Sequence, residues 1–160
     1  MKKYLTILIT ILMCGNVLAA GGDSGGSSKE STYKEGIQLV KRAGKLEKKD
    51  KLEKAKKLYS KAFKKFKSAH FEDKKNPDIL NYLGYTSRKS GNFVQAEEYY
   101  LKGLSIDPKH NGINEYLGEL YDQTNRIDKA NERLKILKNC DCDEYQQLEL
   151  IIKTRGTKIY

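Results

Sequence analysis

The sequence predicts an all-α protein: a helical-hairpin solenoid of about three helix pairs with a C-terminal capping helix, preceded by an N-terminal signal peptide. The main observation is an internal repeat, because Leu83–Gly84 recurs as Leu117–Gly118 and Ala96 recurs as Ala130, each 34 residues later. A repeat of this length is typical of stacked helix-turn-helix units. Apolar residues at helical spacing within each block favour the same fold class.

The two blocks, residues 77–110 and 111–142, each carry the signals of two antiparallel helices. Gly84 and Ala96 are small, so the two helices of the first block can approach each other closely. The turn between them is expected at Gly91, because a helix C-terminus favours a residue that adopts the left-handed conformation. Pro108 ends the second helix, since the residue before a proline disfavours the helical conformation.

This pattern of an early Leu-Gly, a central Ala and a final Pro resembles the tetratricopeptide repeat (TPR). The first block matches more closely than the second, which has Asn125 at the turn glycine and Cys142 in place of the proline. The runs Leu80–Tyr85 and Tyr116–Tyr121 are also similar to small exported TPR proteins of bacteria. The resemblance implies a TPR solenoid and a periplasmic binding or assembly protein.

The N-terminus has the layout of a secretory signal peptide over residues 1–20. Two lysines precede an apolar run over residues 5–13, and small residues allow cleavage near Ala19 or Ala20. The run is shorter than the roughly 20 residues of a spanning helix. An uncleaved membrane anchor and a lipoprotein modified at Cys14 are the alternatives. We therefore expect an exported bacterial protein that is periplasmic or secreted.

Three further segments complete the predicted domain organisation. Residues 21–31 are rich in Gly and Ser and are predicted to be a flexible leader outside the fold. Residues 32–76 are predicted to form a degenerate, basic first hairpin whose first helix begins near Gly36 and whose second helix carries an apolar stripe. Residues 143–160 are predicted to form the capping helix and a tail. The stripe comprises Leu52, Ala55, Tyr59, Ala62, Phe63 and Phe66.

Positive charge is concentrated in the first hairpin. Residues 29–75 hold 17 Lys or Arg and 7 Asp or Glu, a net charge of +10, whereas residues 76–160 have a net charge of −1. A helix face with this charge is either an ordinary solvated surface or a binding surface for an acidic partner or an anionic membrane. Nucleic acid is not expected, because the cations are mostly Lys without stacking aromatic residues. The predicted basic face comprises Lys54, Lys57, Lys61, Lys64 and Lys65.

The concave face of a TPR stack is lined mainly by the first helix of each unit, so repeat position predicts a partner-binding groove. Tyrosines flanked by charges of both signs suit a protein or peptide partner, because tyrosine and arginine are enriched at binding hot spots. The alternative is that the tyrosines pack between helices and that Arg88 pairs with Glu119 or Glu115 at the surface. The predicted groove comprises Asn81, Tyr82, Tyr85, Arg88, Lys89, Glu115, Tyr116, Glu119 and Asp122.

The remaining candidates for chemistry are few. Cys140 and Cys142 are predicted to form a disulfide, because paired cysteines cross-link in an oxidising compartment. Free or intermolecular thiols and a redox-active pair are the alternatives. With only His70 and His110 besides, the chain offers no obvious four-ligand zinc set. No phosphate-binding loop, nucleophile beside a histidine or pair of carboxylates indicates catalysis, so we expect no enzyme, no metal and no cofactor.

The sequence thus predicts an exported protein–protein interaction or assembly module that binds a partner segment in its concave groove. The alternative is a structural or membrane-surface protein that uses the basic first hairpin to make weak contact with anionic surfaces. The sequence specifies neither the identity of the partner nor the oligomeric state.

Overall fold

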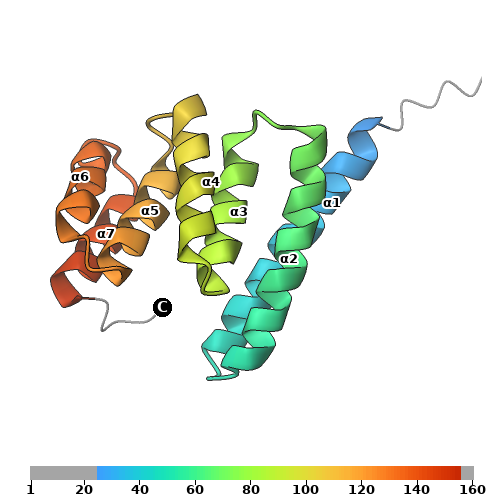
Figure 1. Cartoon of the computed structure of the whole chain (residues 1–160), viewed down its shortest axis with the longest axis horizontal. Coiled ribbons are helices and arrows are strands. Elements are labelled where there is room, and N and C mark those ends of the chain that lie inside the picture. Colours follow the sequence, from blue (N-terminus) through green and yellow to red (C-terminus); the bar gives the residue numbers. More distant parts are fainter. Residues whose placement is uncertain (1–24, 156–160) are drawn as a thin grey trace, which may run out of the picture.

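The computed structural model of the chain describes residues 25–155, and over this range it contains seven α-helices and no strand (Figure 1). The predicted all-α class is therefore confirmed. The predicted signal peptide and residues 156–160 of the predicted tail lie outside the described residues. The helices are α1 (Gly25–Glu47), α2 (Leu52–Glu72), α3 (Pro77–Lys89), α4 (Phe93–Ile106), α5 (Asn111–Gln123), α6 (Ile127–Leu137) and α7 (Asp143–Thr154).

The helices form three antiparallel hairpins that stack side by side and are followed by one terminal helix (Figure 1). Within the hairpins, α1 packs against α2, α3 against α4 and α5 against α6. Successive hairpins meet through α2 and α3 and through α4 and α5, and α7 packs on both α5 and α6. Among the described residues, no helix combines the length and the apolarity that crossing a membrane requires.

The turns inside the three hairpins share one conformation at equivalent repeat positions. Asp50, Gly91 and Asn125 have positive φ angles of 56°, 87° and 59°. After each of them the next N–H bonds to the carbonyl five residues earlier, as from Asn92 to Ser87 at 2.9 Å. This is the pattern of a Schellman C-cap, which requires a residue that tolerates the left-handed region. The turn predicted at Gly91 therefore recurs in all three hairpins.

Small residues allow the two helices of a hairpin to approach each other closely. A β-carbon added at Gly84 of α3 would overlap the ring of Tyr100, a fully buried side chain of α4. Ala96 and Ala130, which define the repeat in the sequence, are also fully buried. The spacing of small residues thus sets how closely the helices lie, and it holds the first helices of the hairpins along one face of the stack.

The first hairpin is longer than predicted, and two predictions about it are wrong. The expected leader ended at residue 31 and the expected first helix began near Gly36, but α1 begins at Gly25, so residues 25–31 are helical rather than a leader outside the fold. Tyr33, which precedes the expected start of the first helix, packs edge-on against Phe66 with 5.8 Å between ring centroids, so α1 packs on α2 before Gly36 as well. Leu52, expected in the apolar stripe, is 56% exposed because it lies in the first turn of α2, at the end of the hairpin.

Candidate functional site

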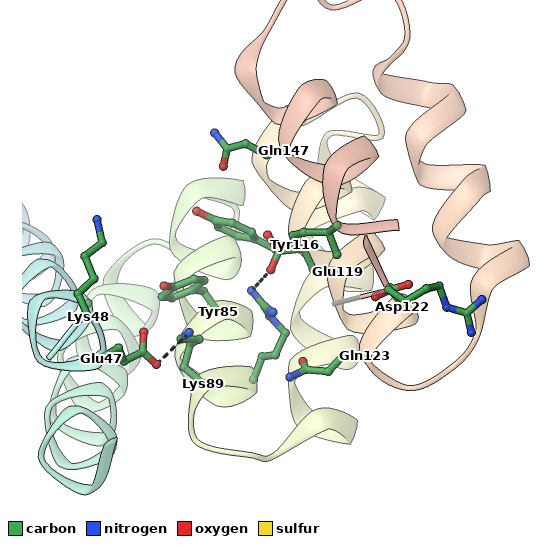
Figure 2. Close-up of a pocket in the computed structure, with 13 residues that line it drawn as sticks. Glu47, Lys48, Tyr85, Lys89, Tyr116, Glu119, Asp122, Gln123 and Gln147 are labelled. Carbon is green, nitrogen blue, oxygen red and sulfur yellow. Dashed lines mark ion pairs between the residues drawn. The ribbon is translucent and has the colours of Figure 1, made fainter. Parts of the chain in front are cut away.

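The first helices of the hairpins and the terminal helix line a cavity of about 520 Å³ on one face of the stack (Figure 2). Three pairs of lining residues occupy equivalent repeat positions where α1, α3 and α5 end, with Lys48 directly after the last residue of α1: Glu47–Lys48, Arg88–Lys89 and Asp122–Gln123. The lining residues are Gly44, Glu47, Lys48, Tyr85, Arg88, Lys89, Tyr116, Glu119, Asp122, Gln123, Gln147, Ile151 and Arg155.

Six of the nine residues predicted for the groove lie together in this cavity. They are Tyr85, Arg88, Lys89, Tyr116, Glu119 and Asp122. Tyr82 does not line it, because its ring stacks on Phe66 with centroids 4.8 Å apart and lies edge-on to Tyr33. Asn81 and Glu115 are buried, at 8% and 3% exposure, and do not line the cavity either. The predicted set therefore divides into a cavity wall and residues that pack behind it.

Sequence analysis missed the parts of the wall that come from the first hairpin and from the end of the chain. Glu47 and Lys48 could have been found, because setting Ala55 of the first hairpin against Ala96 of the second equates Glu47 with Arg88. Gln147 and Ile151 had no such signal, since α7 stands outside the repeats and its register cannot be transferred from them.

A buried ion pair forms part of the cavity wall. Arg88 Nη2 lies 2.5 Å from Glu119 Oε2, and the two side chains are only 9% and 11% exposed. The guanidinium carbon of Arg88 also lies 5.7 Å from the ring centroid of Tyr85 and 5.8 Å from that of Tyr116, within cation–π range. Burial by itself lowers the pKa of Arg88, but the carboxylate of Glu119 opposes it and the net direction is upward. Arg88 thus pairs with Glu119, as the packing alternative expected, but below the surface.

A second ion pair closes the side of the cavity next to α1 (Figure 2). Lys89 Nζ lies 2.9 Å from Glu47 Oε1, and the hydroxyl of Tyr59 donates a hydrogen bond to Glu47 Oε2 at 2.8 Å. The ring of Tyr85 lies 5.8 Å from that of Tyr59 and 4.9 Å from that of Tyr116. Burial raises the pKa of both Tyr85 and Tyr116, so these hydroxyls remain protonated. The row of tyrosines therefore joins all three hairpins through neutral, packed rings.

Glu115 is a buried carboxyl one helical turn before Glu119 on α5. It is 3% exposed, and its Oε1 has no hydrogen-bond partner among the described residues. Burial raises the pKa of Glu115 to about 8, with further contributions from Glu119 and Glu144 and an opposing one from Arg88. At neutral pH Glu115 is therefore largely uncharged beside the Arg88–Glu119 pair.

The predicted basic face lies on α2, outside the cavity. Its exposed members are Lys54, Lys57, Lys61 and Lys64. Lys65 differs from them because it is half-buried and pairs with Glu35 of α1 at 2.5 Å. A second cavity, of about 470 Å³, lies along the seam between α1 and α2, where Arg42, Lys61 and Lys64 lie around it.

The cysteines and histidines occupy structural positions. Cys140 and Cys142 are joined by a disulfide between α6 and α7, with their Cα atoms 5.2 Å apart. The N–H of Ile113 donates a hydrogen bond to His110 Nδ1 at 3.2 Å, so His110 caps the start of α5. Burial lowers the pKa of His70, which favours its neutral form. Within residues 25–155, no group of three or more His, Cys, Asp or Glu is arranged to hold a metal ion.

The stacked hairpins with a common turn and a cavity on the face of their first helices define a helical-repeat protein. Residues 77–110 match the family model described as tetratricopeptide repeat, and this segment contains α3 and α4. This segment is a tetratricopeptide repeat, and the chain has a TPR-like helical-hairpin fold, as the resemblance in the sequence predicted. No curated protein matches the chain significantly in sequence.

Solved structures of the type III secretion translocator chaperone SycD from Yersinia enterocolitica have a similar fold. One aligns with 87% of this chain and 100% of its own at 19% identity and a TM-score of 0.55. Another, SycD in complex with a peptide of the translocator YopD, aligns with 75% of this chain and 88% of its own at 19% identity and a TM-score of 0.53. At this identity the similarity shows the fold alone.

Proposed function

We propose that this chain is a protein–protein interaction module that binds a segment of a partner protein in the groove lined by α1, α3, α5 and α7. The observation that carries the proposal is the pair of tyrosines, Tyr85 and Tyr116, held in the cavity wall by the Arg88–Glu119 ion pair. Large rings that packing already holds in place offer contact area at low entropic cost. TPR-type stacks create extended concave binding surfaces.

The charges of the cavity favour a partner segment with apolar and neutral polar side chains. Glu119 is paired with Arg88 and Glu47 with Lys89, so the wall presents balanced charge rather than a field of one sign. An apolar or aromatic side chain of the partner would lie against the tyrosines, and its main chain would meet the surrounding polar groups. The SycD structure that contains a YopD peptide supports a peptide ligand for a fold of this kind.

The proposed place of action is outside the cytoplasm. Residues 1–20 support it, since two lysines precede a short apolar run and small residues follow. The proposal assigns no catalytic step, cofactor or metal to the groove.

Capture from a periplasmic extract, followed by mass spectrometry, tests the groove when it is combined with two matched tryptophan variants. Gln123→Trp places a large side chain in the cavity wall at an exposed position, whereas Val94→Trp places it on α4 at a site that is 73% exposed and outside the cavity. Partners retained by the wild type and by Val94→Trp should be lost from Gln123→Trp. Retention of the same proteins by Gln123→Trp would contradict the proposal.

Truncating a tyrosine of the cavity wall provides a second test, in which the affinity for a partner identified in this way is measured. Tyr116→Ala should weaken binding about tenfold or more, because truncation of a central tyrosine costs more than about 1–2 kcal/mol at hot spots. Circular dichroism of Tyr116→Ala checks that the helices remain folded. Unchanged affinity in a folded Tyr116→Ala protein would place the binding surface elsewhere.

A further inference from the structure

The exposed side of α2 is a stripe of lysines that ends in an exposed aromatic ring. Lys57, Lys64, Lys67 and Phe71 recur at helical spacing on the side of α2 opposite its buried face. The phenyl ring of Phe71 is 74% exposed although α2 has a buried apolar face of its own. Packing within the described structure therefore does not account for the position of this ring.

The lysines of this stripe present a broad field of positive charge. Lys61 is exposed on α2 next to the stripe, and Lys61, Lys64 and Arg42 of α1 line the second cavity. The wall of this cavity also includes the apolar side chain of Leu39 and the carboxylate of Glu35, which is paired with Lys65. At the end of the stripe the Lys74 ammonium lies 5.8 Å from the centroid of the Phe71 ring. A cation beside an exposed ring is an arrangement in which the ring can enter an apolar layer while the ammonium stays in water.

We propose that this face of the first hairpin docks on an anionic phospholipid bilayer, with Phe71 inserted at the headgroup boundary and the lysines of α2 against the lipid phosphates. The inference goes beyond the proposed groove function, because none of the residues it uses lines the groove. Basic residues on the polar side of an interfacial surface combined with an aromatic anchor are typical of proteins that lie on membranes.

The composition of α2 favours a bilayer over an acidic protein surface. Anionic groups held in fixed positions, carboxylate or phosphate, are best bound by the planar fork of arginine, and α2 contains no arginine. Lysine is a hydrated point charge on a flexible stem, which suits mobile lipid headgroups. With 21 residues, α2 extends for about 30 Å, so the charge is spread along a line rather than gathered in one pocket.

Sedimentation of the full chain with lipid vesicles tests the electrostatic part. Vesicles of phosphatidylcholine with 30% phosphatidylglycerol are compared with pure phosphatidylcholine, so that any contribution of the apolar N-terminal run is subtracted. Lys61→Gln with Lys64→Gln should lower the anionic-over-neutral partition about 30-fold, since each lysine near the surface contributes about fivefold. The control, Lys135→Gln with Lys138→Gln, makes the same charge change at exposed positions far along the chain and should change partition less than about twofold.

Tryptophan fluorescence tests the insertion of the ring, because the chain contains no tryptophan of its own. Phe71→Trp should show a blue shift and protection from iodide quenching when anionic vesicles are added. Val94→Trp, at a site that is 73% exposed on α4, should show neither. A solvent-like spectrum of Phe71→Trp on bound vesicles would overturn the proposal, as would equal binding to neutral vesicles. Binding to poly-glutamate without binding to anionic vesicles would also overturn it and would identify an acidic protein surface as the ligand.

Discussion

Replacing Glu115 with glutamine should change how the stability of the fold depends on pH. The Glu115 side chain is 3% exposed. Burial raises its pKa from the ordinary value of 4.5 to about 8, assisted by Glu119 and Glu144 and opposed by Arg88. In the unfolded chain the same carboxyl returns to its ordinary pKa. Between the two values, the folded protein therefore holds a proton that the unfolded chain has released.

The sign of the effect follows from this difference in bound protons. Where the folded state binds more protons than the unfolded state, the free energy of unfolding falls as pH rises. The slope approaches about 1.4 kcal/mol per pH unit for one proton. Between pH 5.5 and 7.5 the wild type should therefore lose about 2 kcal/mol relative to Glu115→Gln, whose amide cannot ionise. The loss is complete once the pH has passed the folded-state pKa.

Urea denaturation followed by circular dichroism at several pH values from 5.5 to 7.5 measures this difference. Glu98→Gln on α4 serves as the control, because it removes a glutamate from an exposed position and reports the effect of global charge. The unfolding free energies of the wild type and of Glu98→Gln should fall in parallel as pH rises, whereas that of Glu115→Gln should not show this fall. Parallel curves for wild type and Glu115→Gln would show that Glu115 is ionised in the folded state and would refute the reasoning.

Three other substitutions test the packing and the turns. Arg88→Met leaves Glu119 buried without its partner and should lower the unfolding free energy by about 3–5 kcal/mol. The double variant with Glu119→Leu should recover most of this loss. Equal losses in the single and double variants, measured by urea denaturation, would contradict the expectation. Gly84→Ala places a β-carbon against the Tyr100 ring and should lower the stability of the fold, because overpacking costs about 1–3 kcal/mol and helix propensity gains only about 1 kcal/mol. A melting temperature above that of the wild type would contradict this. Asp50→Gly should stabilise the fold by about 0.5–1 kcal/mol, because glycine adopts a φ of 56° without strain. Calorimetry should therefore show a higher melting temperature, and a lower one would mean that the turn needs the aspartate side chain.

The fold was largely predictable because its signals are local and repeated. Gly91 and Asn125 mark turns whose geometry depends on a single residue that tolerates positive φ, and the structure has both. Ala96 and Ala130 indicate, as small residues at one repeat position, where two helices pack, and both are fully buried. Because the sequence repeats every 34 residues, equivalent positions in the next hairpin can be assigned without knowing any long-range contact.

The candidate site was only partly predictable, because repeat position indicates a helix face but not the depth of a side chain on it. Tyr82 and Tyr85 are both on the face assigned to the groove, yet Tyr82 stacks on Phe66 of the longer first hairpin while Tyr85 lines the cavity. The start of α1 at Gly25 could not be inferred from a Gly/Ser-rich segment, because glycine and serine are poorer helix formers than alanine and because the contact between Tyr33 and Phe66, which packs α1 on α2, joins distant parts of the chain. Such contacts join residues far apart in the chain, and composition does not encode them.

The cavity takes its wall from three hairpins and the terminal helix, which belong to successive layers of the stack (Figure 2). A molecule seated there would span the layers like a brace, and bending the stack would require compressing or releasing it. Ligand binding and the curvature of the solenoid would then be thermodynamically linked. A force that changes the curvature would lower the affinity for the ligand, and a bound ligand would make the solenoid harder to bend.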